Sequence, residues 1–265
     1  MEKYLEKPYA LSALGTGVGG EIYYDYLAFF HLILVKKGKK NGFVVPVSVK
    51  NAVKICKKLN LKFKKDDWHN YEECVSENNS LSKETTEKIK KMRRNRIRVH
   101  QDVLCGTDDA ILEKFCSGNI TNEKLGEFEQ YPKCCIKQFT DNVWGDFVQA
   151  AEIIGDTPQN AEMILNVSRA GNADERIFQR LKKIQLEFAD GRKKFPYLFH
   201  QACTDCLNDM ENSPSGKLNK EWGNVAKEFP KLDSLIMQGG IDESEDKKRL
   251  WDKEWQEWID GGCLG

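Results

Sequence analysis

One histidine and two cysteines, each three residues from the next, stand close together in residues 195–206: His200, Cys203 and Cys206. Side chains at this spacing can point toward one centre, either from a helical turn or across a tight turn. Imidazole and thiolate groups bind borderline and soft metal ions, and cysteines at this spacing also recur at redox sites. The stretch therefore predicts half of a metal site or a reactive pair of thiols.

A second stretch, residues 131–139, contains the adjacent cysteines Cys134 and Cys135 shortly after Pro132. Proline suits the first turn of a helix, so we expect a helix over residues 132–140 that begins at these cysteines. The exposed N–H groups and the helix dipole there lower the pKa of a thiol, which favours the thiolate. Adjacent helical residues point about 100° apart. Either one cysteine ligates while the other packs, or a loop-like start presents both.

Together the two stretches offer up to four thiolates and one imidazole. Four cysteines, or three cysteines with one histidine, suit zinc, and the same set suits an iron–sulfur cluster, so the spacing does not separate the two. The softness of thiolate argues against magnesium or calcium. We interpret the chain as a metal-binding protein in which the histidine either ligates or donates a hydrogen bond to a ligand. The expected metal site contains Cys134, Cys135, His200, Cys203 and Cys206.

Two other interpretations of these residues stay open. A thiol oxidoreductase or a cysteine nucleophile would use the same thiols without a metal. Alternatively, the cysteines are buried or incidental small apolar residues. No catalytic residue is assigned, and the site could be structural or catalytic. The five other cysteines are scattered singly, at Cys56, Cys74, Cys105, Cys116 and Cys263.

The composition indicates a soluble globular protein. The chain has 265 residues, of which 31% are charged and 40% hydrophobic, enough for one large domain or two modest ones. No stretch reaches the ~20 apolar residues that span a bilayer, and the N-terminus lacks the residue order of a secretory signal. Nine cysteines form an odd set that does not resemble the disulfide framework of a short secreted protein. We therefore expect a cytoplasmic protein that does not bind membranes.

Charge is spread unevenly although the formal net charge is zero. Lysine and arginine outnumber aspartate and glutamate roughly two to one in residues 1–100, and no acidic residue lies between Lys36 and Lys65. A basic helix is expected from Lys83 to Arg98. Both segments could contact nucleic-acid phosphates, so a nucleic-acid-binding module is an alternative function. A solvated basic surface explains the same pattern without a partner.

The fold class that these patterns predict is α+β, with a small basic α/β subdomain over residues 1–105 and a larger helical domain over residues 106–265. In the first part we expect strands at residues 26–35 and 43–49 joined as a hairpin, a helix from Ser48 or Lys50, and a strand at residues 61–64. Residues 66–82 are expected to form a linker or a long loop. The pattern G-x-G-x-x-G at residues 15–20 lacks the acidic residue expected about 20 positions later, so we interpret it as a flexible loop.

The second part is expected to be helical from Thr107 onward. The stretch Thr107-Asp108-Asp109 offers an N-cap for a helix at residues 110–116, and Thr121-Asn122-Glu123-Lys124 is expected to open a short helix that ends near Tyr131-Pro132. Three tryptophans near the C-terminus, Trp251, Trp255 and Trp258, form one stripe that would dock on the core or on a protein partner. The other expected helices cover residues 147–154, 158–170, 174–190, 218–229 and 232–238.

The two cysteine stretches resemble those of a mainly archaeal family classed as a domain of unknown function. The similarity lies in Leu125-Gly126, in Tyr131-Pro132-Lys133-Cys134-Cys135 with Phe139, and in His200-Gln201-Ala202-Cys203 with Cys206. It covers about residues 40–215 and is most specific at Tyr-Pro-x-Cys-Cys. The resemblance implies that the two stretches belong together, and it implies no activity. The chain departs from the family pattern at residues 127–130, where a more apolar approach with a glycine is usual, and residues after about 240 look like an extension.

Overall fold

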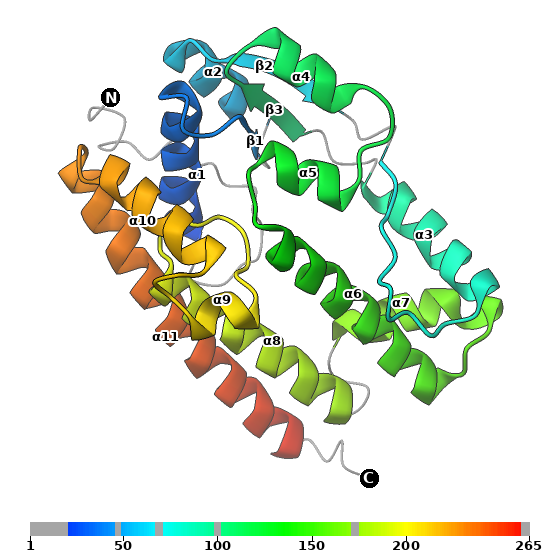
Figure 1. Cartoon of the computed structure of the whole chain (residues 1–265). Helices are drawn as coiled ribbons and strands as arrows, with labels where there is room; N and C mark the ends of the chain where they lie inside the picture. The colour runs from blue at the N-terminus through cyan, green and yellow to red at the C-terminus, as the bar shows by residue number, and fades with distance from the viewer. Residues whose placement is uncertain (1–20, 46–48, 67–70, 98–101, 171–174, 261–265) are drawn as a thin grey trace.

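The computed structural model describes residues 21–45, 49–66, 71–97, 102–170 and 175–260. Over these residues the protein is mostly helical, with a three-stranded antiparallel sheet near one end (Figure 1). The expected α+β class is therefore confirmed. None of the described helices combines the length and the apolar character needed to cross a membrane. The glycine pattern of residues 15–20 lies outside the described residues.

The central strand of the sheet comes last in the sequence. β1 (Gly42–Val45) and β2 (Lys62–Asp66) both pair with β3 (Asp102–Gly106), which gives the order β1-β3-β2. The registers place Phe43 of β1 and Phe63 of β2 opposite the same residue of β3. β1 and β2 fall at two of the expected strands, whereas β3 was not expected because its apolar core spans only three residues.

The other expected strand, at residues 26–35, is wrong: this run belongs to helix α1 (Glu21–Lys36). Nearly all of its side chains from Leu27 to Val35 are buried, including His31. A helix that is buried all round shows no alternation of apolar and polar residues, so its pattern cannot be told from that of a buried strand. α1 packs against the sheet on one side and against α10 (Pro214–Ala226) and α11 (Pro230–Asp260) on another. The expected hairpin before α2 (Val49–Leu59) therefore does not form.

The other helices follow the expected pattern more closely. Both expected helix starts are confirmed: Asp108 accepts a hydrogen bond from the N–H of Ile111 as the N-cap of the first helix, and Thr121 accepts one from the N–H of Lys124 as the N-cap of the second. The segments expected at residues 132–140 and 147–154 are one continuous helix. The helices after α1 are α2 (Val49–Leu59), α3 (Lys83–Ile97), α4 (Asp109–Cys116), α5 (Asn122–Phe128), α6 (Lys133–Ile154), α7 (Ala161–Ala170), preceded by the 3₁₀ turn η2 (Pro158–Asn160), α8 (Glu175–Lys194), α9 (Thr204–Asn208), α10 (Pro214–Ala226) and α11 (Pro230–Asp260).

Helices α8 and α11 lie side by side along one flank of the molecule (Figure 1). The tryptophan stripe is part of α11, and the ring of Trp251 meets Phe178 of α8 edge-on at 5.3 Å between centroids. This tryptophan therefore docks within the protein. The side chains of Trp255 and Trp258 lie outside the described part of the structure, and a protein partner for the stripe stays a prediction.

The lysines of the first basic segment are mostly exposed on α2 and β2, where Lys62 pairs with Asp109 at 2.9 Å. In α3 part of the positive charge has an internal role, because Arg93 forms an ion pair at 2.9 Å with the buried carboxylate of Glu73. Nucleic-acid binding by these segments stays a prediction. The division of the chain near residue 105 also stays a prediction.

Candidate metal centre

Four sulfur atoms from the two predicted stretches lie together in the structure. The Sγ atoms of Cys134, Cys135, Cys203 and Cys206 are all within 4.8 Å of one another. Cys134 Sγ lies 4.0 Å from Cys135 Sγ and 3.7 Å from Cys206 Sγ, and the last two are 3.8 Å apart. Cys134 is half-buried, and the three other cysteines are at most 3% exposed. The chain therefore brings two distant cysteine pairs to one small, enclosed point.

The start of α6 explains how adjacent cysteines reach the same point. Pro132 is the N-cap, so Cys134 and Cys135 are the second and third residues of the helix. Although adjacent helical side chains diverge, both of these sulfurs lie within 4.8 Å of those of Cys203 and Cys206. Of the two arrangements that the sequence left open, the structure adopts the one in which both sulfurs join the group.

Glycine and a left-handed residue allow α5 to turn sharply into α6. A Cβ on Gly126 would lie 2.2 Å from Cδ1 of Ile136, so any larger residue would push α5 away from the start of α6. Gln130, between the two helices, has a φ of 60°, a conformation that favours glycine. Gln130 thus takes a left-handed conformation in the segment where the sequence departs from the pattern expected of the resemblance.

Donors from two further segments point at the sulfur atoms. The backbone N–H of Cys203 donates to Sγ of Cys135 at 3.3 Å, and the hydroxyl of Ser215 lies 3.2 Å from the same sulfur. Ser215 is fully buried and is the second residue of α10. The positive ends of the α6 and α10 dipoles therefore both face the sulfur group, and hydrogen-bond donors with positive helix ends stabilise thiolates. Sequence reasoning missed Ser215, because nothing in its spacing links it to the cysteines.

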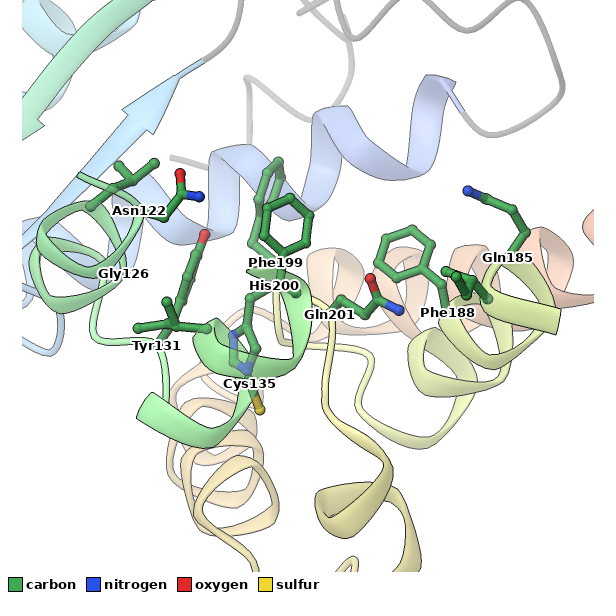
Figure 2. A pocket seen from close by; sticks show the side chains of 13 residues that line it. Asn122, Gly126, Tyr131, Cys135, Gln185, Phe188, Phe199, His200 and Gln201 are labelled. Atoms are coloured by element: carbon green, nitrogen blue, oxygen red, sulfur yellow. The ribbon is translucent and has the colours of Figure 1, made fainter. Parts of the chain in front are cut away.

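His200 lies beside the sulfur group and is not one of its members. Its Nε2 is 3.2 Å from Oγ of Ser215, the hydroxyl that contacts Cys135. Its ring packs against Tyr131 at 4.6 Å between centroids, and Figure 2 shows it between Tyr131 and Cys135. Burial, with the positive charges of Arg192 and Lys40, lowers the pKa of His200 well below its usual value, so the imidazole is neutral near pH 7. This position fits a residue that orients Ser215; ligation by His200 stays a prediction.

Burial makes the thiols of Cys134 and Cys135 less acidic, whereas the sequence predicted a lowered pKa. Desolvation, with the neighbouring thiols, raises the pKa of Cys134 to about 11, and desolvation also raises the pKa of Cys135. For Cys206 burial acts in the same direction, but hydrogen bonds from Ser215 and from the other thiols outweigh it, and the pKa falls below its usual value. The helix start alone therefore does not make Cys134 or Cys135 a ready nucleophile.

Arg192 fixes the segment that leads to Cys203. This buried guanidinium donates to the carbonyl oxygens of Leu198 and Phe199, the latter at 2.6 Å, and it lies over the ring of Phe188 at 4.5 Å. Two carbonyl groups just before His200 are thus held from α8. Arg192 of α8 therefore anchors the backbone that leads to the second cysteine pair.

No protein-family model, curated protein or solved structure matches this chain. The function of the site is therefore argued from its geometry and its chemistry.

Replacing Ser215 with alanine is expected to weaken metal binding by about 10–100-fold, the usual cost of losing a group that supports a ligand. The hydroxyl can donate to the thiolate of Cys135, and alanine cannot. Competition with a chromophoric chelator measures the affinity. The control is Ser168→Ala, which removes another buried hydroxyl, bonded to the carbonyl of Leu165 in α7. Equal affinities for Ser215→Ala and the wild type would show that the hydroxyl does not support the ligand.

Proposed function

We propose that this protein binds one metal ion through four thiolates and that the ion is zinc. The observation that supports this most directly is the grouping of four Sγ atoms within 4.8 Å. Four ligands held about 2.3 Å from one ion at tetrahedral angles lie about 3.8 Å from one another. The separations of 3.7, 3.8 and 4.0 Å between three of these sulfurs scatter around that value.

An iron–sulfur cluster fits this spacing less well than a single ion. In a cluster the cysteine thiolates are distributed over two or four iron atoms, which bridging sulfides separate. Thiolates on different irons consequently stand farther apart than the ligands of one ion. Sulfur atoms that all lie within 4.8 Å of one another therefore support a single ion rather than a cluster.

The role that we propose for the ion is structural. Four thiolates complete a tetrahedral shell and leave no position for water or substrate. The ion would join cysteines that are 71 and 72 positions apart in the chain, at the start of α6 and around α9. Metal-binding free energy at such a site becomes folding free energy. The free thiols of the described chain fit a reducing compartment such as the cytoplasm.

Metal analysis of the purified full chain tests the proposal. We expect a colourless protein that contains about one zinc ion per chain. Elemental analysis by mass spectrometry, an acid-labile sulfide assay and a visible absorption spectrum together distinguish the outcomes. A brown protein with iron and labile sulfide would replace the zinc site with a cluster. A protein purified without chelators that holds neither metal nor sulfide would overturn metal binding altogether.

A further inference from the structure

A pocket of about 420 Å³ adjoins the proposed metal centre. It lies between α5, α6, α8 and the segment before α9, and Cys135 and His200 form part of its wall (Figure 2). Its volume is within the range of about 300–1,000 Å³ that is typical of small-molecule sites. The proposed zinc site is closed, so this space needs an explanation of its own.

Among the described residues that line the pocket there is no aspartate, glutamate, lysine or arginine, although these residues make up 31% of the chain. A carboxylate or phosphate group that entered the pocket would lose hydration without meeting an opposite charge, and an ammonium group would meet only the proposed thiolate of Cys135, which the ion already binds. The portion of a ligand that fills the pocket must therefore be neutral.

Aromatic rings make up much of the wall: Tyr131, Phe139, Phe188 and Phe199. Rings of this kind favour a flat partner, because stacked and edge-on contacts are both available. The wall is also held in place, since Arg192 lies 4.5 Å from the centre of the Phe188 ring and bonds to the carbonyl of Phe199. A preformed wall reduces the entropy lost when a ligand binds.

Three neutral amides supply the polar part of the lining. Gln185 and Gln201 have no hydrogen-bond partner within the described parts of the chain, and Figure 2 shows the Gln201 amide between His200 and Phe188. Asn122 uses its carbonyl oxygen to accept from the hydroxyl of Tyr71 at 2.7 Å, which leaves its NH₂ group as a donor. Each glutamine amide carries a donor and an acceptor side by side, and this arrangement matches a heterocycle edge with a C=O next to an N–H.

We propose that this pocket binds a neutral, planar heterocycle of two or three fused rings, with its faces against the aromatic wall and its donor–acceptor edge toward Gln185 and Gln201. The proposal is independent of which metal the thiolates hold. It concerns a second site on the protein, and metal content and ligand binding are measured separately.

The test compares two fluorescent three-ring probes on the full-length, metal-containing protein. Lumichrome is neutral and carries a C=O/N–H edge, whereas phenanthrene has a similar size and no polar edge. We expect lumichrome to bind more tightly than phenanthrene in fluorescence titrations. Gln201→Leu and Gln185→Leu should each weaken lumichrome about tenfold and leave phenanthrene binding unchanged or tighter. The matched control is Gln179→Leu, an exposed glutamine of α8 outside the pocket.

A variant that fills the pocket tests whether the probe binds there. Ile184→Trp adds bulk to the lining and is expected to abolish the binding of both probes while metal content and helical circular dichroism remain at wild-type values. The proposal is overturned if lumichrome does not bind, if phenanthrene binds as tightly, or if the glutamine variants behave like Gln179→Leu. Lumichrome binding that survives in a folded Ile184→Trp variant places the probe elsewhere and also overturns it.

Discussion

Replacing Cys203 with serine is expected to remove the metal and to lower the melting temperature by roughly 10–20 °C. Structural zinc sites contribute on the order of 10 kcal/mol to the folding of small zinc-dependent peptides. A larger protein with its own core depends less on the ion, so we expect a loss of about 5 kcal/mol here, and a protein of this size loses roughly 2–4 °C per kcal/mol. Elemental analysis and a thermal melt followed by circular dichroism measure the two effects.

The choice of Cys203 separates the loss of the sulfur from the loss of the helix cap. Cys203 is the N-cap of α9, a position that serine fills well. The backbone N–H of residue 203, which donates to Cys135, also remains in the variant. A large fall in stability can therefore be assigned to the missing ligand and not to a damaged start of α9.

Two comparisons make this prediction specific. Cys116→Ser removes a half-buried cysteine of α4 that does not belong to the sulfur group, and it should keep the metal and most of the stability. A strong chelator should lower the melting temperature of the wild type toward that of Cys203→Ser and leave the variant itself unchanged. If Cys203→Ser retained one ion per chain and had the same melting temperature as the wild type, Cys203 would not be a ligand.

The cysteine site was predictable because each of its two cysteine stretches can be recognised from a few neighbouring residues in the sequence. Two residue types with strong metal affinity, at short spacing in two stretches, suffice to suggest a common site without knowledge of the fold. The hydroxyl of Ser215 carries no such signal, because serines at helix starts usually serve as caps and this one becomes relevant only where α10 meets α6. The same holds for Gln185 and Gln201, whose amides face one pocket from different segments.

The fold was predictable where capping residues mark the helix ends and ambiguous where the chain is buried on every side. Asp108 and Thr121 cap the helices that they were expected to cap. The run at residues 26–35 is apolar except for His31, and neither a period of two nor a period of 3.6 can be read from such a run. Packing decides the outcome, since α1 lies between the sheet and α10 and α11 and needs apolar side chains all round.

A second large effect is expected at the buried ion pair between Lys40 and Glu129, which lies behind Tyr131. Nζ of Lys40 is 3.2 Å from Oε2 of Glu129 and 2.8 Å from Nδ1 of His31. The side chains of the pair are 0% and 5% exposed, and the ammonium group also faces the rings of Phe43 and Tyr131. Burial lowers the pKa of Lys40, and the nearby carboxylate of Glu129 opposes that shift. Each charge is thus tolerated because the other is present.

Lys40→Met is expected to destabilise the protein by about 3–5 kcal/mol, because it leaves the carboxylate of Glu129 buried without its partner. Glu129→Gln should act in the same direction by stranding the ammonium group, although the amide oxygen can still accept from the N–H of Val44 as Oε1 does at 3.2 Å. The double variant should be more stable than the sum of the two single losses implies, since no charge remains unpaired. Chemical denaturation of all four proteins in parallel gives the coupling free energy.

The loss of stability from breaking the Lys40–Glu129 pair can be distinguished from a loss of the proposed metal ion. The hydroxyl of Tyr131 also donates to Glu129, so the pair supports the turn that precedes Pro132 and the first cysteine pair. The thiolates themselves are unchanged, and folded Lys40→Met should still hold one ion per chain. The exposed pair of Lys62 and Asp109 is the matched control, and Lys62→Met should change stability little because solvent already screens both charges. Additive losses in the Lys40/Glu129 cycle would mean that the two charges do not stabilise each other.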